Sequence, residues 1–377
     1  MEEKSKLPYV LTAIAALIIG GGAGWFINES SQEKVGELVF EDEENAELGG
    51  YTLTKVETNG NKTVIIPTEY NGEDIVSIGS SVFYANEEVE EVLIPSSVEK
   101  IDFHAFYKCK NLREIVIPNS VTTIGVTAFE DCVNLTRVRI GKNVSEIDSF
   151  AFRGCVSLME ISVHKDNEYY QSIDGNLYSS SFNSKIDILQ QYAIGKTETS
   201  FSVPDGVRSI IDSAFSGSNL ENILLPDSLR GASFTDCKKL TNITIPDSVV
   251  AISRFDGCSN LKSVALPKTF NSLPTFRNCS SLESIVIPEN VSVLSQTHFT
   301  GCAALTSITL PERIVKIGAN AFSGCDNLSS VVFENTAYWT ADRVGRDTVE
   351  FTKAELSDPE TAAKYLTDIY RFYDWSQ

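Results

Sequence analysis

A short apolar motif recurs at a nearly constant interval along most of this chain. The copies Val98–Ser120, Val121–Asn143 and Ile314–Thr336 each have 23 residues and approximate the pattern V-x-x-I-x-x-x-A-F-x-x-C-x-x-L-x-x-I-x-I-P-x-x. Further copies begin at Ile75, Val144, Val207, Leu229, Val249, Phe270 and Val291. One such unit cannot bury its own apolar stripe, so neighbouring copies must stack to bury it between them. The repeat therefore predicts a solenoid of about ten units over residues 75–336.

The local structure of each unit follows from the same pattern. The segment L-x-x-I-x-I-P alternates apolar and polar residues with a period of two, which predicts a short strand. The proline then ends the strand, because it lacks a backbone donor. We therefore expect a β-rich repeat solenoid with short parallel strands and 3-10 or irregular turns between them.

All eight cysteines of the chain occupy one place in the repeat, three residues after a phenylalanine and three before a leucine. Asn86 and Ser218 take that place in the two remaining copies. Stacked copies would align the thiols in parallel, which is poor geometry for a disulfide. We therefore predict buried free thiols that act as small apolar core residues. This structural ladder consists of Cys109, Cys132, Cys155, Cys237, Cys258, Cys279, Cys302 and Cys325.

From residue 50 to residue 336 the unit resembles the BspA-like leucine-rich repeats of bacterial and some protozoan surface proteins. The resemblance implies a curved right-handed solenoid and a role in adhesion or protein recognition. Residues 49–74, with Asn59-Gly60 as a turn between two strands, resemble the family's N-terminal cap hairpin. The insertion at residues 168–206 is similar to extra solenoid strands in the family, and the alternative is a ligand-contacting flap carrying Tyr169, Tyr170, Tyr178 and Tyr192.

The N-terminal part of the chain predicts attachment to a membrane. Residues 7–27 contain no charge and are long enough to span a bilayer. Residues 1–6 contain Lys4 and Lys6, whereas residues 28–48 form an acidic linker, which favours a cytoplasmic N-terminus and extracellular repeats. A cleaved signal peptide is the alternative. Gly20 and Gly24 would also permit a weak homodimer of the anchor helix.

The end of the chain predicts a second cap. Asp358 is a suitable N-cap residue and Pro359 a suitable first helical residue. Apolar residues then recur at helical spacing, so residues 337–377 are expected to close the end of the solenoid with a helix. The copies beginning at Leu229, Val249 and Phe270 have only 20, 21 and 21 residues, and we expect them to change the local curvature.

The outward position of each strand is the natural place for a ligand. Down the repeats this position is mainly apolar or small, and Arg139 is its one charged residue. We predict a basic island for an acidic or glycan-bearing partner, against the alternative of an ordinary solvated face. The candidate ligand-binding residues are Arg113, Val116, Arg137, Arg139 and Met159.

Composition and motifs argue against several other functions. A net charge of -20 disfavours nucleic acid as a partner. The histidines His104, His164 and His298 fall at ordinary repeat positions, and no catalytic motif or metal-binding C-x-x-C pair is present. We therefore expect neither an enzyme nor a cofactor, and no metal.

The leading hypothesis is a single-pass plasma-membrane protein whose solenoid recognises a protein or glycan on host or neighbouring cells. The first alternative is a non-catalytic envelope scaffold or spacer. The second is a sensor subunit that dimerises through its anchor, although residues 1–6 are too short to carry a signalling domain.

Overall fold

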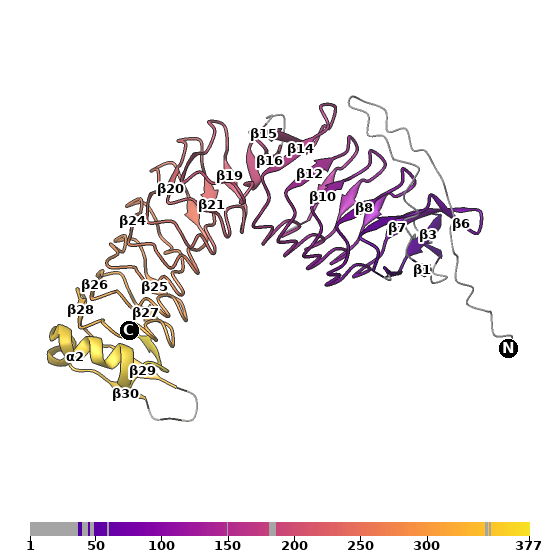
Figure 1. Ribbon diagram of the computed structural model, residues 1–377. Helices are drawn as coiled ribbons and strands as arrows, with labels where there is room; N and C mark the ends of the chain where they lie inside the picture. Colours follow the sequence, from indigo (N-terminus) through magenta and orange to yellow (C-terminus); the bar gives the residue numbers. More distant parts are fainter. Residues whose placement is uncertain are drawn as a thin grey trace. The chain divides into compact units, whose positions relative to one another are not determined.

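The computed structural model describes residues 37–39, 44–45, 49–58, 60–148, 150–180, 186–343, 346 and 348–377. The chain divides into two compact units, unit 1 (Met1–Ser172) and unit 2 (Ile173–Gln377). Each unit contains a stack of similar turns (Figure 1). The described part of the chain forms a β-solenoid of about 12 turns, so the predicted fold class is confirmed.

The predicted membrane anchor at residues 7–27 and the tail at residues 1–6 lie outside the described residues. Most of the predicted linker at residues 28–48 also lies outside them. Of the helices that the structure describes, none combines the length and the apolar character needed to cross a membrane.

Unit 1 is built around two sheets, to which each repeat contributes one strand apiece, and the strands of successive repeats pair in parallel. The first sheet has the strand order β14-β12-β10-β8-β5. Its strands are β5 (Thr63–Ile65), β8 (Glu91–Leu93), β10 (Glu114–Val116), β12 (Arg137–Ile140) and β14 (Glu160–Val163). The second sheet has the order β13-β11-β9-β7-β3-β2. Its strands are β2 (Glu44–Asn45), β3 (Gly50–Leu53), β7 (Glu73–Ile78), β9 (Lys100–Ile101), β11 (Thr123–Ile124) and β13 (Glu146–Ile147). Strand β2, at the edge of the second sheet, pairs antiparallel with β3.

The N-terminal cap differs from its prediction. We predicted two strands pairing with each other across Asn59-Gly60, but β3 pairs in parallel with β7 and β5 pairs in parallel with β8. Strand β4 (Lys55–Glu57) pairs antiparallel with β1 (Glu37–Val39), which belongs to the predicted linker. The physical reason is that the first repeat leaves one edge of each sheet open. By adding a strand to both edges, this segment becomes a further turn of the solenoid.

A hairpin does occur nearby, between β6 (Glu69–Tyr70) and β7. Its turn residues Asn71 and Gly72 have φ values of 54° and 86°. Positive φ at both central residues is the requirement of a type I′ turn, for which Asn-Gly is the favoured sequence.

The core of each unit is a set of columns in which equivalent side chains stack. In unit 1 the rings of Phe83, Phe106, Phe129 and Phe152 follow one another with centroid separations of 4.7, 4.9 and 5.5 Å. In unit 2 a second column runs through Phe215, Phe234, Phe255, Phe276, Phe299 and Phe322. The interplanar angles stay between 3° and 14°. Nearly parallel rings show that successive turns repeat the same local geometry.

Unit 2 continues the same architecture. One sheet contains, in order, β16 (Asn176–Ser179), β17 (Ile188–Gln191), β19 (Ser209–Ile210), β21 (Gly231–Ala232) and β23 (Ala251–Ile252). Strand β15 (Tyr170–Ile173) leads into it through a turn at Asp174-Gly175, where both φ values are positive. The other sheet contains β18 (Ser200–Ser202), β20 (Asn222–Leu224), β22 (Asn242–Thr244) and β24 (Ser263–Ala265).

The insertion at residues 168–206 provides a turn of this solenoid. Strand β17 pairs in parallel with β19, and β18 pairs in parallel with β20. Of its four tyrosines, Tyr170, Tyr178 and Tyr192 are buried, and Tyr169 alone is half exposed. These placements correspond to the extra-strand interpretation rather than to a tyrosine-lined flap.

The last of the three short repeats interrupts both ladders of unit 2, whereas the first two keep their strands. The repeat beginning at Phe270 has no strand, and its backbone forms a single isolated bridge between Arg254 and Thr275. Beyond it, the ladders resume as β26 (Ser307–Leu310) with β28 (Ser330–Phe333), and as β25 (Val293–Leu294) with β27 (Lys316–Ile317). Phe276 still stacks between Phe255 and Phe299, at 5.4 and 5.7 Å. The side-chain core is therefore continuous where the sheets are not.

The C-terminal segment closes the end of unit 2 (Figure 1). Strand β31 (Asp374–Ser376) pairs antiparallel with both β27 and β29 (Thr340–Asp342), and β30 (Val349–Glu350) pairs with β29. The helical part consists of α1 (Lys353–Ser357), α2 (Pro359–Lys364) and the π-helical turn η1 (Tyr365–Ile369). As predicted, Asp358 caps α2 by accepting a hydrogen bond from the Thr361 backbone N–H, and Pro359 is in the first turn.

Candidate functional site

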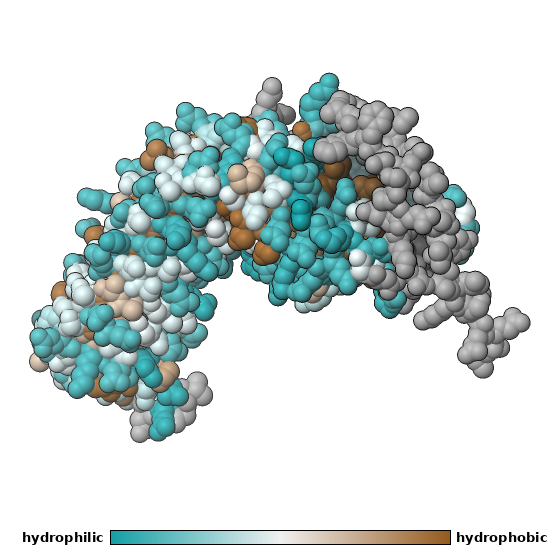
Figure 2. Space-filling model, viewed as in Figure 1, coloured by the Kyte–Doolittle hydropathy of each residue, from teal (hydrophilic) through white to brown (hydrophobic). Residues whose placement is uncertain are grey.

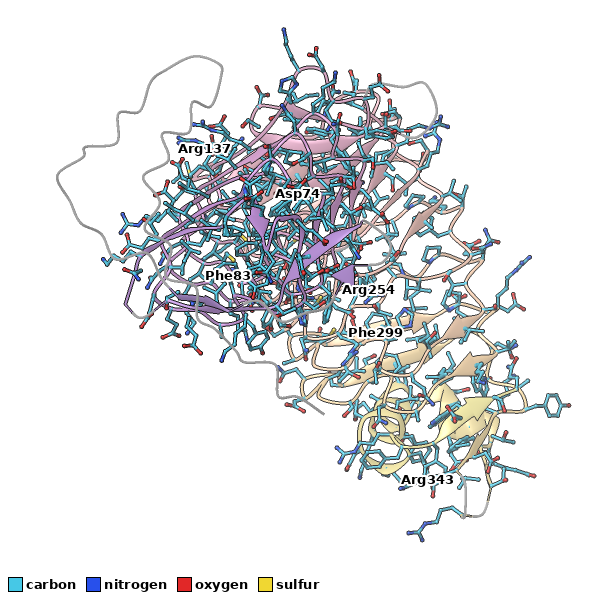
Figure 3. All side chains as sticks on the ribbon, turned by 90° about the vertical axis from the view of Figure 1, so that its right-hand side faces the viewer. Asp74, Phe83, Arg137, Arg254, Phe299 and Arg343 are labelled. Atoms are coloured by element: carbon cyan, nitrogen blue, oxygen red, sulfur yellow. The ribbon has the colours of Figure 1, made fainter. Side chains whose placement is uncertain are left out.

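The five candidate ligand-binding residues lie on the first sheet of unit 1, which we call the unit 1 face. Strands β10, β12 and β14 pair in register, so that Glu114, Arg137 and Glu160 form one outward column. Val116 and Arg139 form a second column with Ser162. Arg139 is exposed, and Val116 and Met159 are 45% and 47% exposed. The structure therefore brings all five residues to one surface, and Arg137 projects outward whereas Phe83 lies inside the stack (Figure 3).

Two arginines of the predicted basic island pair with carboxylates of neighbouring turns. Arg137 lies between two carboxylates, with Nη1 2.6 Å from Glu114 Oε1 and Nε 3.2 Å from Glu160 Oε2. Arg113 pairs with Glu90 at 3.1 Å, and Glu90 also accepts a 2.6 Å hydrogen bond from Lys62. Because that hydrogen bond favours the ionised form, it holds the pKa of the Glu90 carboxyl below its ordinary value.

The charges on this face are mixed in sign. The four cations are Lys62, Arg113, Arg137 and Arg139, and the four anions are Glu90, Glu91, Glu114 and Glu160. Their sum is zero. Stacking places Arg113 and Arg137 beside glutamates of neighbouring turns, so these two arginines are neutralised. Glu91 and Glu114, in contrast, are neighbours of like charge. Arg139 has no carboxylate within ion-pair distance among the described side chains.

The corresponding surface of unit 2, which we call the unit 2 face, has a different character. Its outward column on β18, β20, β22, β24, β26 and β28 and the strandless rung between them contains no charged residue. Leu224 is 62% exposed and Val286 is 83% exposed. The complete column is Ser202, Leu224, Thr244, Ala265, Val286, Thr309 and Val332.

A second uncharged column runs beside it. It consists of Ser200, Asn222, Asn242, Ser263, Ser284, Ser307 and Ser330. Its members bond along the column, as in the 2.8 Å hydrogen bond that the Ser263 hydroxyl donates to Asn242 Oδ1. The apolar character of the outward column was evident from the sequence, but the prediction gave more weight to the arginines. The signal that it missed was the run of Ser and Asn at one strand position in every repeat of unit 2.

Over the part of the chain that Figure 1 draws in orange, Figure 2 shows hydrophilic and intermediate residues with hydrophobic ones scattered among them. Scattered apolar residues are ordinary on a protein surface. The feature that distinguishes the unit 2 face is that every turn presents a small or aliphatic uncharged side chain at the same position.

All eight cysteines are buried free thiols. Seven of them donate an S–H hydrogen bond to the carbonyl of the phenylalanine in the preceding repeat, with Sγ···O distances of 2.9–3.1 Å. Cys237 is the exception and contacts Thr235 O at 3.8 Å. The thiol thus links one turn to the next as well as filling the core.

Burial raises the pKa of the Cys132, Cys258, Cys279 and Cys302 thiols and raises that of Cys325 to about 12. Because the thiolate is the reactive form, these side chains are unsuited to nucleophilic catalysis.

The number of cysteines that can be alkylated should differ completely between the native and the unfolded protein. We expect iodoacetamide at pH 8 to modify none of the 8 cysteines in the native chain and all 8 in guanidinium chloride without reductant. Burial and the raised thiol pKa values protect the native state. Intact-mass spectrometry measures the number of adducts. Disulfides would be revealed by an even number of cysteines that react only after reduction.

His298 is buried, and both of its ring nitrogens form hydrogen bonds within the fold. Its Nδ1 accepts a 3.1 Å hydrogen bond from the Ser295 backbone N–H, and its Nε2 donates to Pro274 O at 2.9 Å. The neutral ring with its proton on Nε2 satisfies both contacts. Burial lowers the pKa of His298, although the charge of Asp256 acts weakly in the opposite direction.

This arrangement predicts a loss of stability in mild acid. The unfolded histidine has a pKa of about 6.5, and the folded one is lower, so the unfolded state binds more protons between the two values. Stability contributed by His298 is therefore present above pH 6.5 or so and is lost as the pH falls toward the folded pKa. We expect His298→Gln to reduce the pH dependence of the urea midpoint between about pH 5 and 7. An unchanged pH dependence in the variant would contradict this assignment.

The other two histidines lie at the surface turns. His164 Nδ1 accepts a 3.2 Å hydrogen bond from the Asp166 backbone N–H, and His104 lies among aromatic rings. In the described part of the chain, no group of three or more His, Cys, Asp or Glu residues is arranged to hold a metal ion.

Stacked turns with parallel ladders, an inward phenylalanine column and a capped end define a leucine-rich repeat solenoid. The family model described as "BspA type Leucine rich repeat region (6 copies)" matches residues 76–197, 195–275 and 274–344. The chain therefore belongs to the BspA-type leucine-rich repeat family.

The chain is similar to several solved structures, and the first of those described below shows the same fold. A leucine-rich repeat protein from Eubacterium ventriosum ATCC 27560 is 21% identical, with 83% of this chain and 95% of that chain covered and a TM-score of 0.59. A leucine rich cell surface protein from Faecalibacterium prausnitzii A2-165 is 22% identical, with 84% and 96% covered and a TM-score of 0.49. A leucine-rich repeat protein from Bacteroides ovatus ATCC 8483 is 25% identical, with 78% and 87% covered and a TM-score of 0.47. No curated protein matches the chain in sequence.

Proposed function

We propose that this chain is a non-catalytic recognition protein that binds an extended protein partner along the unit 2 face. The observation that carries the proposal is the uncharged double column on that face, in which Leu224 and Val286 are 62% and 83% exposed. Periodic, solvent-accessible positions on a solenoid suit an extended partner that contacts several turns. Binding there would desolvate few charges, which lowers the cost of association.

The location of this activity is part of the proposal. The uncharged segment at residues 7–27 supports a membrane anchor, and the excess of acidic residues after it supports extracellular repeats. The family is one of surface proteins, which agrees with display outside the cell. The alternative of a cleaved signal peptide gives the same exposure without the anchor.

The unit 1 face is a weaker candidate for the same role. The arginines Arg113 and Arg137 are committed to neighbouring glutamates. An acidic partner would therefore have to compete with ion pairs that already exist. What this face still offers is Arg139 with the half-exposed Val116 and Met159.

Two double variants, one on each face, test the proposal and show which face binds the partner. The full-length chain in phospholipid nanodiscs would be immobilised and probed with fibronectin, laminin and collagen. We expect at least one of these to bind, and Leu224→Asp with Val286→Asp to weaken that binding at least about tenfold, or about 1.4 kcal/mol. The control is Arg139→Glu with Met159→Asp, which alters the unit 1 face and should leave the affinity unchanged. Equal affinity of the unit 2 variant and the wild type, or a loss confined to the unit 1 variant, would overturn the proposal.

A separate measurement tests the location. An impermeant protease applied to intact cells should release the repeats if they are displayed outside. Protection until the envelope is opened would favour the scaffold alternative.

A further inference from the structure

The strandless rung, residues 270–290, is attached along its length to the turn that precedes it. Phe255 N–H donates to Thr275 O at 2.8 Å, and Glu283 N–H donates to Lys262 O at 3.1 Å. One of these bonds reaches the rung before its cysteine and the other reaches it after the cysteine. The attachment to the preceding turn therefore resembles that of an ordinary repeat, although the strands are absent.

The attachment to the following turn, residues 291–313, is confined to one corner. Among the described residues, every hydrogen bond that the strandless rung forms with this turn comes from residues 274–280. Outside that corner the backbone N–H groups of Ile285, Val286 and Ile287 have no partner in the described part of the chain. We call this connection the joint. Its bonds are Phe276 N–H to His298 O at 2.8 Å, Asn278 N–H to Thr300 O at 2.7 Å, Ala304 N–H to Ser280 O at 3.0 Å, and the side-chain bonds of His298 and Cys302.

His298 occupies a place at the joint where most repeats have a small residue. Phe276 follows Phe270, the first apolar residue of its repeat, by six positions, whereas Phe299 follows Val291 by eight. The imidazole is 2% exposed. A larger side chain thus stands where the neighbouring turn is shorter. The residues at the equivalent place in five other repeats are Ala105, Ala128, Ala151, Ala214 and Ala321.

The imidazole connects both sides of the joint while it is neutral. Its Nε2 donates to Pro274 O of the strandless rung at 2.9 Å, and its Nδ1 accepts from the Ser295 N–H of its own turn at 3.1 Å. A proton on Nδ1 would remove that acceptor and oppose two N–H groups to each other. The contacts of the closed joint therefore require the neutral ring.

The surroundings of the ring also favour its neutral form. Burial lowers the pKa of His298, and the groups that act in the opposite direction are the carbonyls of Pro274 and Leu273 and the carboxylate of Asp256. The two carbonyls come from the strandless rung, and Asp256 is the charged group, from the turn before it. Asp256 Oδ1 already accepts a 2.9 Å hydrogen bond from the Arg277 backbone N–H. Because burial has the largest effect, the closed joint opposes protonation.

We propose that unit 2 opens locally at the joint, and that His298 is a latch that releases the joint in mild acid. Local opening occurs where few backbone hydrogen bonds cross between neighbouring segments, and here only one corner must separate. Opening exposes the imidazole to water, where its pKa returns to about 6.5. The open form therefore binds a proton more readily than the closed form, and its population rises as the pH falls through that value.

The joint crosses the unit 2 face. Val286 lies on one side of it and Thr309 lies on the other. A partner that contacts both sides would be held less tightly when the joint is open, so mild acid would weaken its binding. This consequence rests on the partner proposed above, whereas the joint and its latch do not.

Amide hydrogen exchange of the full-length chain in phospholipid nanodiscs tests the joint. The reporters are Phe276 and Asn278, whose N–H groups donate across it, and the matched controls are Phe255 and Gly257, whose N–H groups donate to the strandless rung from the preceding turn. At about pH 7.5 we expect the reporters to be protected at least about tenfold less than the controls, after correction for intrinsic exchange rates. Equal protection of reporters and controls would overturn the joint.

The same amides test the latch. Between about pH 7.5 and 5.5 the protection of the reporters relative to the controls should fall several-fold further, and by no more than about tenfold, the limit set by a histidine pKa of about 6.5 in the open form. His298→Gln should abolish this pH dependence, because the amide can occupy the same contacts and does not titrate. His164→Gln, at a surface turn of unit 1, should retain it. A pH dependence that persists in His298→Gln would overturn the latch.

A measurement on the wild-type chain makes the result independent of how the variant folds. The Cys302 Sγ donates across the joint to Phe276 O, whereas the Cys258 Sγ donates to Phe234 O in an ordinary turn. Dithiodipyridine, whose leaving group allows reaction with thiols in acid, should modify Cys302 several-fold faster relative to Cys258 at about pH 5.5 than at pH 7.5. Peptide mass spectrometry measures this ratio, and an unchanged ratio would overturn the proposal. Since no partner is used in these measurements, they leave the proposed function untouched if they fail.

Discussion

Replacing Trp375 by alanine is expected to lower the free energy of unfolding of the C-terminal cap by about 3–5 kcal/mol, the usual cost of deleting a large buried ring. The indole is 1% exposed and stacks on Phe351 with centroids 4.3 Å apart. Its N–H donates to Tyr370 O at 3.3 Å. Trp375 also lies at the centre of β31, which pairs with β27 and β29 at once. One side chain therefore joins the cap to the last turns of the repeat.

Hydrogen exchange with mass spectrometry measures this effect locally. Peptides from residues 337–377 and from β27 should lose protection together, because a solenoid couples each turn mainly to its neighbours. Phe333 and Ile317 would then become accessible, and we expect the variant to aggregate more readily than the wild type. The control is Tyr338→Ala, since that ring is 90% exposed and its loss should change stability by no more than about 0.5 kcal/mol. Equal protection in Trp375→Ala and the wild type would mean that the cap does not depend on this ring.

The repeat made most of this architecture predictable from sequence. A fixed interval determines which residues stack, so the inward places of Phe129, Cys132 and Leu135 could be assigned from the spacing alone. The start of α2 was equally predictable, because an aspartate followed by proline has a local physical meaning at a helix N-terminus. These successes depend on short-range chemistry or on exact repetition.

The failures arose where pairing depends on a neighbouring turn. We predicted a hairpin in the cap because Asn59-Gly60 lies between its strands, but β3 and β5 pair instead with the open sheet edges of the first repeat. We interpreted the arginines as a basic island because we considered their own positive charge and not the glutamates that stack beside them in neighbouring turns. The spacing already contained the correction, since Glu114, Arg137 and Glu160 are each 23 residues apart and must stack.

The loss of strands around Phe270 had a weaker signal. The repeats are shorter than the others, and we therefore expected a change in local geometry. Their composition did not indicate which backbone hydrogen bonds would be lost. In the repeat beginning at Phe270, the phenylalanine stack and the thiol hydrogen bonds of Cys279 and Cys302 are retained. The strands of both ladders are absent there. In this part of unit 2 the side-chain core, rather than the sheet, maintains the continuity of the solenoid.

The same reasoning predicts the largest single-residue effect in unit 1. Phe129→Ala is expected to lower its free energy of unfolding by about 3–5 kcal/mol. Phe129 is fully buried, and its ring contacts Phe106 at 4.9 Å and Phe152 at 5.5 Å. Its carbonyl also accepts the hydrogen bond from Cys155 Sγ at 3.1 Å. The cavity therefore weakens the contacts to both neighbouring turns.

Urea unfolding followed by circular dichroism measures the loss, with Val116→Ala as the matched control in the same unit. Val116 is 45% exposed, so its truncation should cost no more than about 0.5 kcal/mol. Phe129→Leu should fall between the two, because it keeps apolar volume but removes the stacked ring. If Phe129→Ala cost no more than Val116→Ala, the ring column would not be the element that joins successive turns, and the ladders alone would have to hold unit 1 together.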